Sequence, residues 1–317
     1  MKKLFSIGLL AGVVALFLFL AHATLFPQNS AARIVLIEPG ARLSAIVEGL
    51  AKEGALAHPQ FFKAWAYFTR RQNSLRAGEY EIPARATVRE ILSMLSGGIG
   101  RNRFATIPEG LTAKQVQVLL ATFEGLTGEI PDIKDGEILP QTYAYIRGQT
   151  RAALVERMRR DMASALEHEW NNRAPGLPLN TPQEALVLAS IIEKETSLDD
   201  ERPLAAAVFV NRLKKGMRLQ ADATVVYAIT NGLGDMKGKK LFLTDLRVAS
   251  PYNTYENRGL PPAPIANPGL LSIRAALNPA PVDYLYFVAD GTGGHKFASD
   301  LITHEKNRAA WRKVRGN

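Results

Sequence analysis

Apolar and polar positions along the chain form patterns that predict both helices and strands. The first is an uncharged apolar run over residues 4–21, preceded by Lys2 and Lys3. Its length suits a helix that crosses the hydrocarbon core of a bilayer, and the lysines favour a cytoplasmic N-terminus. We therefore expect residues 1–24 to be a single-pass anchor in the inner membrane, with the rest of the chain in the periplasm. The alternative is a cleaved signal peptide, because Ala21-His22-Ala23 satisfies the small-x-small cleavage rule.

The next segment, residues 25–102, shows a small set of alternating periodicities. β-branched or alternating residues predict two strands, and apolar positions at helical spacing predict two helices between them. In chain order these elements are expected at residues 34–37, 43–50, 61–68 and 78–82. The sequence thus predicts a small βααβ module.

Residues 182–197 predict a helix whose apolar positions end at two carboxylates. Thr181 can cap it, and Pro182 suits its first position. Apolar residues fill the faces that lead to Glu193 and Glu195, so we expect a desolvated carboxyl at a cleft edge. Desolvation raises a carboxyl pKa and keeps a proton available near neutral pH, as a general acid requires. The alternative is that both glutamates open the solvated end of a core helix.

A tight return after the next helix offers two further polar candidates, Gln220 and Asp222. Both are candidate substrate ligands, because the return places them beside the helix over residues 182–197. For Asp222 the alternative is a helix N-cap for residues 224–229. Glu109, in a turn before Gly110, is a further carboxylate, which we interpret as solvated.

A second polar loop, residues 250–268, is too rich in proline for a helix or a central strand. Tyrosine rings suit sugar faces, and amides suit hydroxyl and N-acetyl groups, so this loop could line a sugar groove. Its candidate substrate contacts are Tyr252, Asn253, Thr254 and Tyr255. The alternative is an ordinary loop whose tyrosine rings fill the core.

Composition narrows the classes of partner. The 317 residues carry 39 Lys and Arg against 30 Asp and Glu, a net charge of +9. Such a basic chain can bind nucleic acid, anionic lipid or an anionic cell-wall polymer. It has no recognisable nucleic-acid-binding motif, so we expect no nucleic-acid partner. With 0 cysteines and scattered histidines, we also expect no metal and no cofactor.

Four segments in matching order resemble the YceG-like endolytic murein transglycosylase family. They are ASIIEKET (189–196), VFVNRLKKGMRLQADATVVYAI (208–229), SPYNTYENRGLPPAPIANPG (250–269) and DYLYFVADGTGGHKF (283–297). The resemblance extends from about Ile34 to Trp311. Alanine stands at 221, 223 and 263 where the family usually has a hydroxyl residue, proline and glycine.

The resemblance implies a catalytic glutamate in the ASI-x-EKE segment, which is matched to Glu193. Residues i and i+2 point about 200° apart on an ideal helix, so only one of Glu193 and Glu195 can face a given cleft. Helical periodicity does not choose between them; the resemblance selects Glu193.

The resemblance also implies a fold and a reaction. The fold is α+β, with a transmembrane helix, a LysM-like module over residues 25–102, and a catalytic domain over residues 103–317 with a lysozyme-like helical centre. LysM modules of cell-wall proteins bind glycan; the alternative for this segment is a spacer domain.

The implied reaction is non-hydrolytic cleavage of the MurNAc–GlcNAc β-1,4 bond in nascent peptidoglycan strands. It leaves 1,6-anhydroMurNAc ends and terminates glycan elongation, and peptidoglycan synthases are expected partners. Ordinary glycosidases need two carboxylates, whereas only Asp222 adds an acid to the motif loops. The alternatives are a non-catalytic peptidoglycan-binding scaffold and a hydrolytic muramidase.

Overall fold

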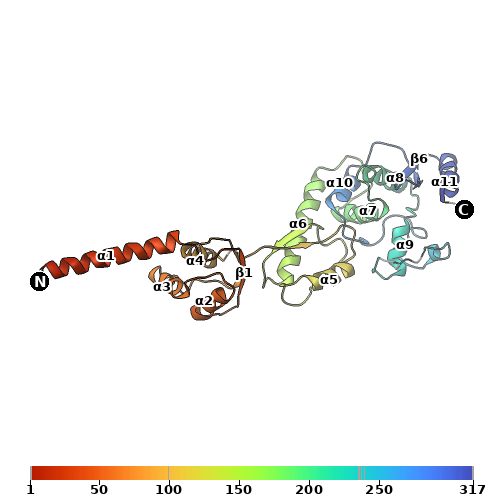
Figure 1. The fold of residues 1–317 in the computed structure, drawn as a ribbon. Helices are drawn as coiled ribbons and strands as arrows, with labels where there is room; N and C mark the ends of the chain where they lie inside the picture. Colours follow the sequence, from red (N-terminus) through yellow and green to blue (C-terminus); the bar gives the residue numbers. More distant parts are fainter. Residues whose placement is uncertain (1, 99, 235, 237, 239, 316–317) are drawn as a thin grey trace. The chain divides into compact units, whose positions relative to one another are not determined.

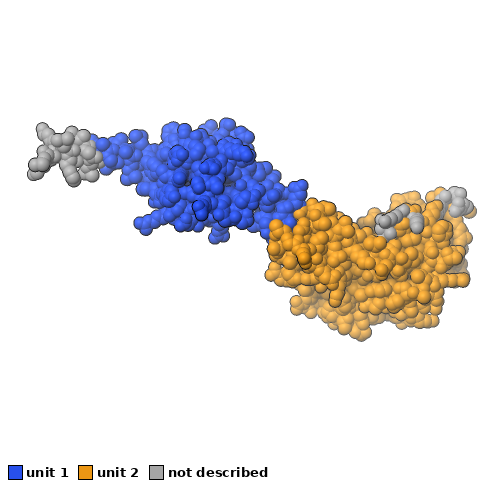
Figure 2. Space-filling view, turned by 90° about the horizontal axis from the view of Figure 1, so that it is seen from below, with its two compact units in different colours: residues 1–104, 124–126, 144–149 blue, residues 105–123, 127–143, 150–317 orange. Residues whose placement is uncertain are grey.

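The chain folds into two compact units, coloured blue and orange in Figure 2. Unit 1 contains residues 1–104, 124–126 and 144–149, and unit 2 contains the remainder. The computed structural model describes residues 2–98, 100–234, 236, 238 and 240–315. The mixture of helices and short strands confirms the expected α+β class.

Unit 1 combines a two-stranded sheet with helices. Its elements are α1 (Lys2–Leu25), β1 (Arg33–Ile37), α2 (Leu43–Lys52), α3 (Pro59–Phe68), β2 (Gly78–Ile82) and α4 (Val88–Gly97). β1 and β2 are antiparallel, and Val35 lies opposite Tyr80. Both side chains are buried, whereas Ile34 and Leu36 alternate to the exposed face. The predicted βααβ order is present, and its LysM-like binding character stays a prediction.

The N-terminal helix α1 packs its last turns onto α3. Ala23 is fully buried, and the ring of Phe19 lies 4.8 Å from that of Phe61 and 5.5 Å from that of Trp65, measured between centroids. Within the part of the chain that the structure describes, no helix combines the length and apolar character needed to cross a membrane. The expected transmembrane anchor is therefore not confirmed.

Unit 2 surrounds one buried helix, α7 (Pro182–Glu195), with other helices (Figure 1). The chain from residue 103 onward contains β3 (Arg103–Thr106), α5 (Ala113–Thr122), β4 (Thr142–Tyr145), α6 (Arg151–Asn171), α7, α8 (Arg202–Lys214), α9 (Asp222–Ile229), the 3-10 turn η1 (Asp245–Arg247), α10 (Leu270–Leu277), β5 (Tyr286–Ala289), β6 (His295–Ala298) and α11 (Leu301–Arg315). β3 pairs with β4, and β5 pairs with β6. α7 contacts α6, α8, α9 and α10.

Helix α7 begins and is buried as its sequence predicts. The Thr181 hydroxyl accepts a hydrogen bond from the Glu184 amide at 3.2 Å, and Pro182 occupies the first turn. Every residue from 185 to 192 is buried, and full burial of one isoleucine contributes roughly 1.5–3 kcal/mol. The helix ends at Glu195, because Thr196 adopts an extended conformation. Both carboxylates therefore lie where the buried run meets the surface.

The proline-rich loop after η1 is fixed directly to α7. The buried Ser190 hydroxyl donates to the Val187 carbonyl at 2.7 Å and accepts from the Ile265 amide at 3.0 Å. Asn267, also fully buried, donates from its side-chain amide to the Leu111 carbonyl at 2.9 Å. Because these polar groups are buried, each unmade bond would cost about 1–3 kcal/mol. The loop is thus a rigid wall beside the end of α7.

Candidate active site

The two glutamates at the end of α7 point to different neighbours, as their spacing requires. Glu193 Oε2 accepts hydrogen bonds from Arg202 Nη1 at 2.9 Å and from the Gly269 amide at 3.0 Å. Its side chain is only 6% exposed. Glu195 instead faces the start of α9, where it accepts a hydrogen bond from the Ala223 amide. The structure therefore gives the two carboxylates separate surroundings.

Arg202 is the centre of an ion-pair cluster on the Glu193 side. Its guanidinium also contacts Asp199 at 3.2 Å, Glu109 at 3.5 Å and the Ser272 hydroxyl. Burial, and then the negative charge of Glu193, raise the pKa of Glu109. Glu109 is exposed, as its turn predicts, and its carboxylate also contacts the Arg202 guanidinium. The cluster joins α7 to the start of α8 and to α10.

The surroundings of Glu193 are closely packed. A Cβ built on Gly269 would lie 1.9 Å from Glu109 Oε1, so the Glu109 side chain would have to move to admit a larger residue there. On the other side, a Cβ on Gly110 would lie 3.5 Å from Cγ of Glu193, and Lys194 donates to the Gly110 carbonyl at 3.2 Å. These contacts favour a structural role for the Glu193 cluster.

Glu195 has the properties of a proton donor. Its Oε1 is buried and has no hydrogen-bond partner among the described residues. Desolvation, and then the nearby charge of Asp222, raise the pKa of Glu195 to about 7. An unpaired buried carboxyl oxygen is costly, so native proteins keep one mainly where function requires it. At neutral pH this group is a mixture of protonated and ionised forms.

Asp222 does not cap α9, so the capping interpretation is wrong. It is the first residue of the helix; Ala221 holds the cap position without a side-chain bond. Asp222 Oδ1 instead accepts a hydrogen bond from the Tyr255 hydroxyl at 2.6 Å. Asp222 is exposed and Tyr255 is half-buried, so both reach the surface beside Glu195. A second carboxylate therefore does lie in this region.

Gln220 completes this group in an unusual backbone conformation. Its φ of +51° lies in the left-handed region, which costs a non-glycine residue of order 1–3 kcal/mol. The amide of Gln220 donates to the Thr254 carbonyl at 3.1 Å, and its side-chain Oε1 accepts from Arg212 at 3.3 Å. The side chain is exposed. Strain of this kind is often retained at ligand-binding sites.

Gln220, Asp222 and Tyr255 line a pocket of about 530 Å³ in unit 2, which falls within the usual range of small-molecule sites, roughly 300–1,000 Å³. Its walls include Arg212, Gln220, Asp222, Leu241, Phe242, Leu243, Leu246, Tyr255, Phe287, His304 and Arg308. Phe242 and Leu243 are 65% and 83% exposed, so they form an apolar rim. We name this cavity, the candidate site of reaction, the catalytic pocket; Glu195 is not among the residues that line it.

Two of the expected substrate contacts are buried instead. The Asn253 side-chain amide donates to the Leu246 and Val248 carbonyls, both at 2.9 Å. The Thr254 hydroxyl accepts from the Ala221 amide at 3.0 Å. Both residues are at most 1% exposed, so they hold the loop rather than face a ligand. Tyr252 lines a different pocket.

Sequence reasoning missed the wall contributed by α11. Burial, and then Arg308, lower the pKa of His304, and its ring stacks on Tyr286 with centroids 4.9 Å apart. Only the contact between distant segments reveals this wall, because the spacing of His304 and Arg308 fits any amphipathic helix. Among the described residues, no group of His, Asp and Glu is arranged to hold a metal ion.

Comparison with known proteins identifies the family. The model of the YceG-like family matches residues 35–310. A Bacillus subtilis protein named endolytic murein transglycosylase is 30% identical over 302 residues, which cover 85% of this chain and 82% of the relative. A Streptococcus pneumoniae protein of the same name is 28% identical over an alignment of 318 positions; the alignment covers 86% of this chain but 57% of that longer protein.

A solved structure agrees in sequence and fold. The crystal structure of a putative YceG-like protein from Listeria monocytogenes is 28% identical and aligns with a TM-score of 0.55. The alignment covers 88% of this chain and 99% of that one. Because the family match spans most of its length, this chain belongs to the YceG-like family.

Proposed function

We propose that this chain is a lytic transglycosylase that cuts peptidoglycan glycan strands internally. Membership in the YceG-like family and relatives named endolytic murein transglycosylase support this activity. The observation that carries the proposal is Glu195, whose carboxyl pKa of about 7 suits a general acid. The bond is the β-1,4 bond between MurNAc and GlcNAc, and the product carries a 1,6-anhydroMurNAc end.

We assign the proton donor to Glu195 rather than to Glu193. Glu193 makes an ion pair with a buried guanidinium and accepts a backbone amide, so both donors already bind its carboxylate oxygen. Glu195 has a buried oxygen without a partner and lies beside exposed polar groups. A general acid must carry a proton near neutral pH, and the raised pKa of Glu195, about 7, supports this assignment.

The reaction needs no nucleophile from the protein. Glu195 gives its proton to the glycosidic oxygen as the bond from MurNAc C1 to that oxygen breaks. The resulting carboxylate takes the proton of the MurNAc C6 hydroxyl while O6 forms its bond to C1. Glu195 regains its proton, and no water is consumed.

Asp222 and Gln220 support this reaction without bonding to the sugar covalently. Burial, and then the negative charge of Asp222, raise the pKa of Glu195 and so favour its protonated form; the same charge stabilises positive charge that develops at C1. Tyr255 fixes the Asp222 carboxylate by its 2.6 Å hydrogen bond. The exposed Gln220 amide is free to bind a sugar hydroxyl on its NH₂ side.

A hydrolytic muramidase is the second candidate, because Asp222 is a second carboxylate near Glu195. A hydrolase would use it as nucleophile or as a base for water. Its Oδ1 already accepts the hydrogen bond from Tyr255, which favours the electrostatic role. The transglycosylase cuts nascent strands and thereby terminates their elongation, so peptidoglycan synthases are the partners that this role implies.

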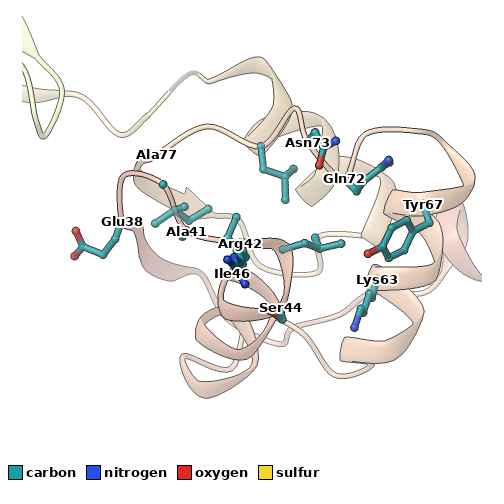
Figure 3. Close-up of a pocket in the computed structure, with 14 residues that line it drawn as sticks. Glu38, Ala41, Arg42, Ser44, Ile46, Lys63, Tyr67, Gln72, Asn73 and Ala77 are labelled. Carbon is teal, nitrogen blue, oxygen red and sulfur yellow. The ribbon is translucent and has the colours of Figure 1, made fainter.

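In the same proposal, unit 1 is a LysM-like module that binds glycan. A pocket of about 510 Å³ lies where β1, α2, α3 and the segment before β2 meet (Figure 3). Tyr67 and Lys63 of α3 lie across it from Arg42, and Tyr67 is 54% exposed. Gln72 Oε1 is buried there without a partner among the described residues, so it can accept a hydrogen bond from a sugar hydroxyl.

Glutamine substitutions distinguish the two carboxylates. Glu195→Gln keeps the shape but removes the proton, so kcat/KM on purified glycan strands should fall about 10²–10⁴-fold. Glu193→Gln should lower the melting temperature, because Arg202 loses its buried ionic partner, yet retain at least tenfold more activity than Glu195→Gln. Chromatography of the released glycans measures both. If Glu193→Gln were the less active of the two variants, Glu193 would be the acid.

The pH dependence of activity tests the charge that surrounds Glu195. The acid must be protonated, so kcat/KM should fall as pH rises through about 7, the pKa of Glu195. Asp222→Asn removes the neighbouring negative charge, so the fall in kcat/KM should begin at a lower pH. Asp199→Asn should leave the pH of this fall unchanged. If kcat/KM falls at the same pH in Asp222→Asn as in the wild type, the electrostatic role of Asp222 is contradicted.

The unit 1 pocket is tested by binding to whole sacculi. Tyr67→Ala removes the exposed ring from the pocket, so sacculus binding in a sedimentation assay should weaken more than turnover of short soluble glycans. Val118→Ala, at an exposed site in unit 2, is the control. Equal loss of binding and turnover in Tyr67→Ala would make this segment a spacer.

A further inference from the structure

A second pocket in unit 2 lies at the other end of α9 from Asp222. Its volume is about 570 Å³, again within the usual range for small ligands. Tyr227 and Asn231, at and just beyond the end of α9, line it together with Tyr252. Lys114 and Gln117 of α5 form the facing wall. The function derived above does not use this pocket.

The aromatic wall of this pocket is held rigidly. The Tyr227 hydroxyl donates to Asp135 Oδ2 at 2.6 Å, and Asp135 Oδ1 accepts from the Ala113 amide at 2.6 Å. The rings of Tyr227 and Tyr252 lie 4.8 Å apart between centroids, tilted by 47°. A Cβ on Gly232 would lie 3.4 Å from the Tyr227 hydroxyl, so the turn closes tightly on that ring. Two tyrosine rings are therefore fixed at the pocket before any ligand arrives.

The amide side chains of Asn231 and Gln117 also line this pocket. The Lys114 ammonium donates to the Asn231 carbonyl and so links α5 to the turn after α9. Asn231 has a φ of +50°, a strained conformation that this bond helps to hold. Gln117 adds a second side-chain amide, which makes one long hydrogen bond of 3.4 Å to the Pro131 carbonyl. Fixed rings suit the apolar face of a pyranose, and amides suit its hydroxyl and acetamido groups.

Both pockets are built from the same two segments. Asp222 begins α9 in the catalytic pocket, and Tyr227 lies near its end in the second pocket. Likewise, Tyr255 lines the catalytic pocket, and Tyr252, three residues earlier in the same loop, lines the second. Eight helical residues span roughly 10 Å, so the two ends of α9 are separated by no more than the length of a short oligosaccharide.

We propose that the pocket between Tyr227, Tyr252 and Gln117 is a distal sugar subsite, which binds an N-acetylated pyranose of the strand being cut beside Glu195. This rests on the proposed function. Binding energy from such a remote subsite orients the strand at the reacting bond. It also requires the strand to extend beyond the catalytic pocket, which favours cuts away from one strand end.

The test compares substrates of different length. For wild type and Tyr252→Ala, kcat/KM is measured on long peptide-free glycan strands and on the shortest oligosaccharide that the wild type cleaves. The ratio of long to short should fall about tenfold in Tyr252→Ala, equivalent to about 1.4 kcal/mol. Tyr252→Phe, which keeps the ring, should restore most of the ratio. An unchanged ratio, from equal losses or no loss, overturns the subsite.

A binding measurement separates this proposal from the proposed function. Calorimetry with long strands and Glu195→Gln needs no turnover, and adding Tyr252→Ala should weaken the affinity about tenfold. If the wild type cuts no glycan but this loss appears, the reaction is wrong and the subsite stands. If Tyr252→Ala does not fold, Gln117→Ala takes its place and should show a smaller loss of the same kind. An unchanged affinity in a folded variant contradicts the subsite.

Discussion

Desolvation of one carboxyl group at the end of a buried helix is the constraint on which the site depends. Neighbouring helices cover α7 along its length, so Glu195 leaves the core with one oxygen still out of water and a pKa of about 7. The orientation of Glu195 is set from the other side of the helix. On that side Glu193 is bound to Arg202 and to the Gly269 amide, which ties the end of α7 to α8 and to the residue before α10. The two glutamates thus have separate surroundings, an ion pair for Glu193 and a desolvated site for Glu195.

Hydrogen bonds from a tyrosine hydroxyl to a carboxylate occur near both ends of α9. Tyr255 donates to Asp222 in the catalytic pocket, and Tyr227 donates to Asp135 in the second, both at 2.6 Å. Asp222 is exposed and acts on Glu195 by its charge, whereas burial raises the pKa of Asp135, which serves to hold a ring. The same type of hydrogen bond therefore orients a carboxylate beside Glu195 in one pocket and holds an aromatic ring in place in the other.

The sequence predicts local structure better than it predicts partners. Capping by Thr181 and the apolar run are local, so α7 was predictable nearly to its last residue. The separate surroundings of Glu193 and Glu195 were not predictable, because they depend on Arg202, Gly269 and α9 covering different faces. The buried hydrogen bonds of the residues at 253 and 254 likewise join segments that no local pattern connects. The residue pattern of a polar loop is the same whether its side chains contact a ligand or pack into the core.

The most direct test of the central claim, that the substrate supplies its own nucleophile, is the mass of the ends formed in ¹⁸O-labelled water. Glu195 returns to its protonated state without water, so the wild type should produce 1,6-anhydroMurNAc ends that carry no label. A hydrolase would place one labelled oxygen at each new reducing MurNAc end. Labelled reducing ends as the main product would contradict the transglycosylase and assign Asp222 a direct part in hydrolysis.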